Sequence, residues 1–139
     1  MRRIFTLIFL LLFILTALPT EGQDLRGRTN ALIGRIQSDG VVRNSSNSQI
    51  GKIDSDGKIR DANNSLIGKI DNDGNIRDAN NSQIGKIDND GKIRNASNTQ
   101  IGKIDSDGTL RNASNSQIGS AKGIKKEWAA VVFFFFFDF

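Results

Sequence analysis

The stretch IGKIDSDGKIRDANNSL at residues 50–66 holds two short strand-like segments and two turn signals within seventeen residues. Asp54 opens the first turn and Gly57 closes it, a pattern typical of a type I turn followed by a left-handed residue. Only glycine adopts that conformation without steric cost. The second turn, residues 62–65, is rich in side chains that hydrogen-bond to their own backbone.

The first turn also determines which side chains share a face of the unit. It sets Ile53 opposite Ile59 on one face, while Lys52 and Arg60 point to the other face, toward water. A helix is disfavoured because every unit contains two glycines and several asparagines, which are poor helix formers. The pattern therefore predicts a two-stranded β unit with one apolar side.

This 17-residue unit recurs five times in succession, and a sixth copy begins at residue 118 before it departs from the pattern. The copies span residues 33–49, 50–66, 67–83, 84–100 and 101–117. The fixed positions are Gly34, Gly51, Gly68, Gly85 and Gly102; Ile36, Ile53, Ile70, Ile87 and Ile104; Arg43, Arg60, Arg77, Arg94 and Arg111; and Asn47, Asn64, Asn81, Asn98 and Asn115. The Asp-Gly pair that ends each first turn is equally constant. One unit buries too few aliphatic side chains to fold alone, so the units must share a core.

Two all-β arrangements provide such a core. The units can close radially around an axis, as propeller-like β-hairpins, or stack linearly as a short β-solenoid. Radial closure is favoured, because a linear stack leaves two open edges that need caps. The closing segment, residues 118–139, ends in the apolar run Trp128 to Phe139. This run does not alternate, so we expect a strand buried on both faces that fills the core. The alternative is an exposed patch, Phe133–Phe139, that docks on a partner or a membrane surface.

The repeats and the ending GSAKGIKKEWAAVVFFFFFDF together resemble the bacterial five-fold beta-flower proteins, over about residues 33–139. The resemblance implies radial five-fold closure. It implies no established activity and supplies no catalytic or binding residues. The first unit departs from the others because Gln37 stands where they have aspartate.

The start of the chain has the layout of a secretory signal peptide. Arg2 and Arg3 precede the apolar run Ile4 to Leu18, and small residues before Gln23 predict cleavage after Gly22. We therefore expect a signal peptide (1–22), a lead-in segment (23–32) and a five-repeat β domain (33–139). The protein is expected in the periplasm, at the cell surface or outside the cell. The chain has no cysteine, which leaves packing and strand pairing to stabilise it.

Composition argues against nucleic-acid binding and against enzymatic activity. The net charge of +4 is spread over interleaved Lys, Arg and Asp, and the repeats carry no aromatic residue for base stacking. Histidine, cysteine and tyrosine are absent, so Ser-His and Cys-His nucleophile systems are excluded. A repeat also places its aspartates in equal environments, whereas carboxylate catalysis needs unequal ones.

The Asp-x-Asp-Gly tetrads are weak candidates for calcium ligands. They contain Asp54 and Asp56, Asp71 and Asp73, Asp88 and Asp90, and Asp105 and Asp107. The calcium-loop pattern also needs an earlier aspartate and a later bidentate glutamate, and Lys52 and Asn63 occupy those positions. We therefore expect structural turns, with no metal and no cofactor.

The sequence predicts an exported, non-catalytic structural or interaction module, and it does not identify the partner. The alternative is a multivalent protein that binds a cell-surface glycan, because equivalent loops can combine weak contacts. A cell-surface protein is another possible partner. A calcium-dependent β-roll is the third reading.

Overall fold

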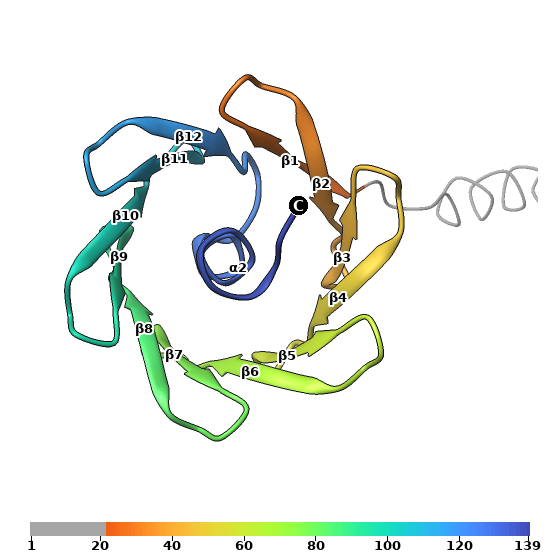
Figure 1. Ribbon diagram of the computed structural model, residues 1–139, viewed down its shortest axis with the longest axis horizontal. Helices are drawn as coiled ribbons and strands as arrows, with labels where there is room; N and C mark the ends of the chain where they lie inside the picture. Colours follow the sequence, from red (N-terminus) through yellow and green to blue (C-terminus); the bar gives the residue numbers. More distant parts are fainter. Residues whose placement is uncertain (1–21) are drawn as a thin grey trace, which may run out of the picture.

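The computed structural model describes residues 22–139, which form a ring of β-hairpins around a central C-terminal helix (Figure 1). The predicted signal peptide lies outside the described residues except for Gly22. Within residues 22–139, no helix is long and apolar enough to span a membrane.

Twelve short strands form the ring. They are β1 (Gln23–Gly27), β2 (Leu32–Ile36), β3 (Val41–Asn44), β4 (Gln49–Ile53), β5 (Lys58–Asp61), β6 (Leu66–Ile70), β7 (Asn75–Asp78), β8 (Gln83–Ile87), β9 (Lys92–Asn95), β10 (Gln100–Ile104), β11 (Thr109–Asn112) and β12 (Gln117–Ser120). Each strand pairs antiparallel with the next, and β1 pairs with β12 to close the circle. The predicted all-β fold with radial closure is confirmed, and the linear solenoid is set aside.

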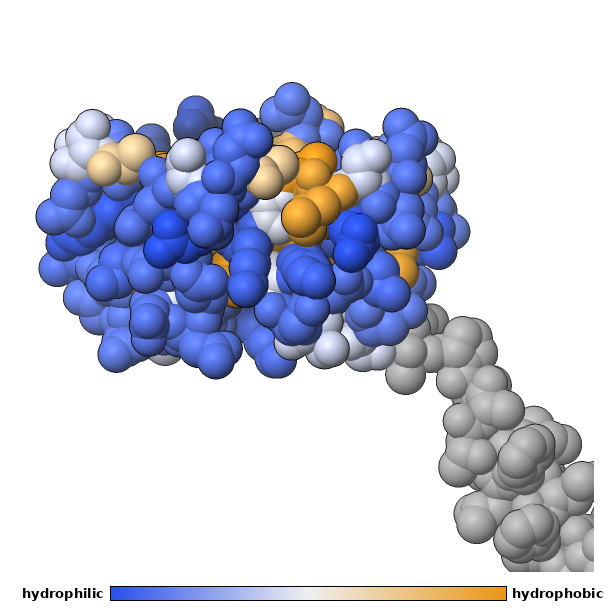
Figure 2. Space-filling model, turned by 90° about the horizontal axis from the view of Figure 1, so that it is seen from below, coloured by the Kyte–Doolittle hydropathy of each residue, from blue (hydrophilic) through white to orange (hydrophobic). Residues whose placement is uncertain are grey.

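The register confirms the predicted faces of the unit. Ile53 pairs with Ile59, and Lys52 pairs with Arg60. Both isoleucines are fully buried and belong to one continuous core, whereas the two basic residues are partly exposed. The side of the ring seen in Figure 2 is accordingly largely hydrophilic, with apolar residues gathered mainly in one patch.

The ring begins earlier than the five repeats indicate. The five units supply ten strands, β2 to β11, and the incomplete sixth unit supplies β12. The twelfth strand is β1, which lies within the segment 23–32 that we expected to be only a lead-in. Leu25 is fully buried, like Ile59, and Asn30 shares the left-handed conformation of Asn64. Residues 24–32 thus repeat the second half of a unit, and this partial copy removes the free edge of the sheet.

The Asp-Gly turns connect neighbouring hairpins, and the predicted turn geometry is confirmed. Gly57 donates its backbone N–H to the carbonyl of Asp54 at 3.0 Å, and its φ is +91°. The carbonyl of Gly57 then accepts the N–H of Ile70 at 2.9 Å. The same glycine-to-next-unit bond recurs from Gly40 to Gly108, so each turn is tied to the unit that follows it.

The second turn forms the outer tip of each petal in Figure 1. In the petal after β5, the Asp61 carboxylate accepts backbone N–H groups from Asn63 and Ser65 at 2.9 and 3.0 Å. Asn64 takes φ = +67°, a conformation in which asparagine is among the best-tolerated non-glycine residues. The equivalent asparagines have the same φ sign, which explains why this position does not vary.

The apolar tail is not the buried strand that we expected. It forms α2 (Lys126–Ala130) and then a π-helical turn, η1 (Val131–Phe136), inside the ring. Every strand of the closed ring already has two neighbours, so an inserted strand would find no edge to pair with. A helix satisfies its backbone internally and can therefore occupy the centre. The expectation that the tail fills the core holds, since Val131 and Val132 are fully buried.

The phenylalanine run meets the glycines of the repeat one by one. Phe133, Phe134, Phe135, Phe136, Phe137 and Phe139 lie against Gly119, Gly102, Gly85, Gly68, Gly51 and Gly34 respectively. Because a π-helix closes its hydrogen bonds over five residues, successive side chains step around the axis by smaller angles than in an α-helix. At Phe137 the backbone becomes extended. Side chains of an extended segment alternate in direction, which explains why Asp138 is skipped.

Candidate ligand-binding groove

The first aspartate of each tetrad is engaged by an arginine of the same unit. Arg60 Nε donates to Asp54 Oδ2 at 3.1 Å, and Arg60 Nη1 donates to the carbonyl of Asn64 at 3.2 Å. Asp71, Asp88 and Asp105 are held in the same way by Arg77, Arg94 and Arg111, at 3.1, 3.0 and 2.8 Å. The fixed arginine therefore joins one turn to the other within its unit.

The second aspartate of the tetrad supports the backbone of its own turn. Asp56 Oδ1 accepts the N–H of Lys58 at 3.2 Å, and Asp90 and Asp107 accept equivalent N–H groups at 3.1 and 3.0 Å. These backbone hydrogen bonds lower the pKa of all three carboxyl groups below the ordinary value. Asp73 occupies the equivalent place in its unit, before Gly74.

The candidate metal ligands are distributed around the ring, one pair to each turn. Within residues 22–139, no three acidic, histidine or cysteine side chains come close enough to share a metal ion. In the first unit Gln37 replaces the arginine-binding aspartate, and Arg43 keeps only its bond to the carbonyl of Asn47, at 3.0 Å. Gln37 thus leaves the first unit without the carboxylate that pairs with the arginine in the later units.

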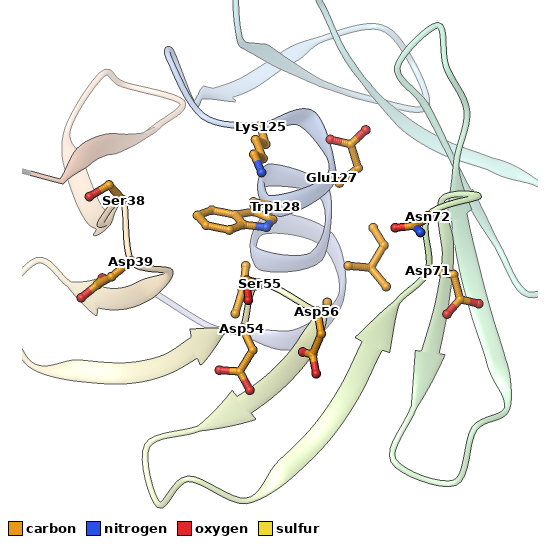
Figure 3. Close-up of a pocket in the computed structure, with 13 residues that line it drawn as sticks. Ser38, Asp39, Asp54, Ser55, Asp56, Asp71, Asn72, Lys125, Glu127 and Trp128 are labelled. Carbon is orange, nitrogen blue, oxygen red and sulfur yellow. The ribbon is translucent and has the colours of Figure 1, made fainter.

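The helix inside the ring borders a groove along one rim. Lys126 Nζ donates to the carbonyl of Asn89 at 2.8 Å, and α2 also contacts β10. The Asp-Gly turns of three successive units form one wall of this groove. A cavity of about 790 Å³ lies between them and α2 (Figure 3).

The groove is lined by turn residues on one wall and by helix residues on the other. Ser38, Ser55 and Asn72 occupy the same position in three successive turns. Lys125, Glu127 and Trp128 supply the opposite wall, and the indole projects toward the turns (Figure 3). An adjoining hollow of about 280 Å³ also includes Ser38, Lys125 and Trp128. Trp128 therefore lies where the two hollows meet.

Sequence reasoning identified the aspartates of these turns but did not place Trp128 beside them. The aromatic residue that the repeats lack comes from the helix, which the sequence indicated as a buried strand. One signal for a helix was available: Trp128 is followed by two alanines, and alanine is the most favourable helix former.

Comparison with known families identifies one match. The sequence profile of a family described as 5-fold beta-flower protein matches residues 22–137, which include β1 and the tail up to Phe137. Searches of curated proteins and of solved structures found no match for the chain.

Proposed function

The chain belongs to the five-fold beta-flower family, and from this premise we propose that it is an exported, non-catalytic binding module. Its binding face is the rim where the Asp-Gly turns surround α2. The observation that carries this proposal is the groove of about 790 Å³ at that rim. A volume in this range is typical of ligand sites, which span roughly 300–1,000 Å³.

Polar groups of the repeat at the petal tips are used for internal bonds, which supports the choice of this rim. At the petal tips, Asp61 and its equivalents accept backbone N–H groups, and the arginine Nη1 groups are bound to backbone carbonyls. The rim of the turns instead combines exposed polar side chains with the half-buried Trp128. This mixture of an apolar body and convergent polar groups is characteristic of recognition sites.

The protonation behaviour of the carboxylates supports a non-catalytic role. A general acid at neutral pH needs a carboxyl group whose pKa is raised. In this ring the resolved shifts of Asp56, Asp90 and Asp107 are downward, since each accepts a backbone hydrogen bond. These groups remain ionised and hold the turns together.

Export is supported by the charged and apolar start of the chain and by the position of β1. This strand begins at Gln23, immediately after the predicted cleavage position. N-terminal sequencing of the protein purified from expressing bacteria tests the proposal. We expect the mature chain to start at or near Gln23 in the periplasm or medium, and an intact chain found only in the cytoplasm would contradict export.

Binding through the rim is tested by sedimentation of the mature protein with isolated bacterial cell envelopes. We expect the parent to sediment with envelopes and Trp128→Ala to stay in the supernatant. The control is Gln83→Ala on the outer wall, which should sediment like the parent. Equal sedimentation of both variants, or no sedimentation of the parent, would remove this rim as the binding face.

A further inference from the structure

The groove is a single crescent although the ring is built from repeats. We use crescent for the space between the turns at residues 38–39, 54–57 and 71–72 and the helix residues Lys125, Glu127 and Trp128. The rim turns are chemically alike, but α2 is held against the turn at residues 88–91 by Lys126 and packs near β10. The turns around residues 38–39, 54–57 and 71–72 are the ones that line the cavity with Lys125, Glu127 and Trp128. This asymmetry favours one extended site over several equivalent sites.

The turn wall of the crescent carries a regular series of small polar groups. Ser38, Ser55 and Asn72 recur every seventeen residues, and their turns are linked by fixed backbone bonds. The N–H of Ile53 binds the carbonyl of Gly40 and the N–H of Ile70 binds that of Gly57, both at 2.9 Å. Hydroxyl and amide groups are thus presented along the crescent at a spacing that the fold determines. A linear polymer with regularly placed hydroxyl groups can meet such a series in register.

The charges in the groove are mostly neutralised by neighbouring residues. Asp54 and Asp71 pair with Arg60 and Arg77 at 3.1 Å, and Asp56 pairs more loosely with Lys58, at 3.7 Å.

Two further carboxylates, Asp39 and Glu127, line the groove together with one cation, Lys125. This balance gives no basic surface for phosphate or nucleic acid, which are held by clusters of Lys and Arg. It also gives no concentrated negative field for a strongly cationic ligand. The groove therefore suits a polar ligand without net charge.

Trp128 supplies the apolar surface that such a ligand needs. Lys125 Nζ lies 5.2 Å from the centre of the indole ring, and Lys125 itself is exposed. An exposed cation–π contact is weak, so an arriving ligand can displace this ammonium group. Sugar rings present C–H groups on one face and hydroxyl groups around the edge. The indole and the polar turn wall match those two features.

We propose that the crescent binds a neutral oligosaccharide, with one sugar ring packed on Trp128 and its neighbours along Ser55 and Asn72. This inference rests on the proposed function and deepens it by naming the ligand class. The main cavity of about 790 Å³ continues into the hollow of about 280 Å³ beside Trp128. A short chain of sugars therefore fits this space better than a single sugar does.

The test is titration of the mature protein, followed by the fluorescence of Trp128, the only tryptophan of the chain. The probes are hexasaccharides of neutral glucans, mannans and chitin, with oligogalacturonate and spermine as charged comparisons. We expect a saturable change with at least one neutral hexasaccharide and none with the charged probes. Binding should weaken by roughly three- to tenfold in Ser55→Ala, in line with the loss of one hydrogen bond.

The matched control is Ser106→Ala, because Ser106 occupies the same turn position in a unit outside the groove. We expect it to bind like the parent, whereas Trp128→Ala should lose at least tenfold in affinity by calorimetry and Trp128→Phe should regain part of that loss. If Ser55→Ala and Ser106→Ala changed the ligand affinity equally, the crescent would not be the binding site. A response only to charged probes, or to no probe, would overturn the ligand class. If Trp128→Ala still abolished binding to cell envelopes, the proposed binding rim would stand and only the ligand class would be wrong. If Trp128→Ala had no effect on envelope binding either, both proposals would be wrong.

Discussion

The phenyl ring of Phe136 occupies the space that a Cβ atom on Gly68 would need. The same relationship joins the other phenylalanines of the tail to the glycines of the remaining hairpins. The glycine at the second position of each unit is therefore constant because an aromatic ring lies against its backbone. The phenylalanine run and the repeat are two halves of one packing arrangement.

Gly68→Ala should destabilise the ring. The added methyl group would meet Phe136, and it would also lie 2.6 Å from the carbonyl oxygen of Arg77, which the sheet holds in place. Overpacking of this kind costs about 1–3 kcal/mol, so the melting temperature should fall by several degrees. The control is Gly27→Ala, whose methyl group would meet only the Ile33 side chain, at 3.3 Å. Matching melting temperatures for the two variants would refute the glycine–phenylalanine packing.

Truncation after Val132 should abolish the cooperative unfolding transition. It removes all the phenylalanine rings that pack on the hairpin glycines, and the remaining aliphatic core is small for a ring of twelve strands. Calorimetry and binding of an apolar dye measure the outcome, with Asp138→Ala on the exposed end of the tail as the control. A truncated chain that melts like the parent would show that the tail docks elsewhere.

Gly74→Val should be severely destabilising. Gly74 has φ = +85°, and a Cβ atom there would run into the carbonyl oxygen of Ile87. A β-branched residue is strained at positive φ even where space is available. The control is Ser106→Val, which introduces the same β-branched side chain into an equivalent turn at a position whose φ is not positive. Denaturant unfolding should show a loss for the first variant that is several times larger than for the second.

Gln37→Asp should stabilise the ring by up to about 1 kcal/mol, the usual range for a partly exposed ion pair. It places a carboxylate opposite Arg43, equivalent to the Asp54 carboxylate that pairs with Arg60. The gain should shrink at high salt. Asp54→Asn is the reciprocal change and should cost a similar amount, as measured by urea unfolding at two salt concentrations. If neither variant moves the urea midpoint, the pair contributes nothing measurable.

Acid should weaken the β1–β2 hairpin through Asp24. Hydrogen bonding from Arg35, together with Arg26, lowers the pKa of this carboxyl group below its ordinary value of 3.8. A lowered pKa means that its contribution to stability is complete above pH 3.8 and is lost as the pH falls through the folded-state value. Unfolding measured from pH 6 to pH 2 should therefore show a shallower acid decline in Asp24→Asn. Asp138→Asn serves as the control and should follow the parent.

The repeat by itself determined the local structure of this protein. The Asp-Gly spacing specified the turn, and the alternation around Ile53 and Ile59 specified which face is buried, because both depend on residues close in the chain. Closure of the ring followed from the need to avoid open edges. The partial copy at β1 was overlooked because it lacks the glycine turn of the full unit, although Arg26, Asn30 and Gly34 keep the spacing of the later copies.

Only the tertiary structure decided the form of the tail and the existence of the groove. Valine and phenylalanine favour strands, yet a closed ring offers a strand no partner, so the tail is helical and its rings meet the glycines in turn. Lys126 of α2 binds the carbonyl of Asn89, and Trp128 of the same helix lines the cavity with the turns of three units. The sequence repeats, but the site arises where the one non-repeated element breaks the symmetry of the ring.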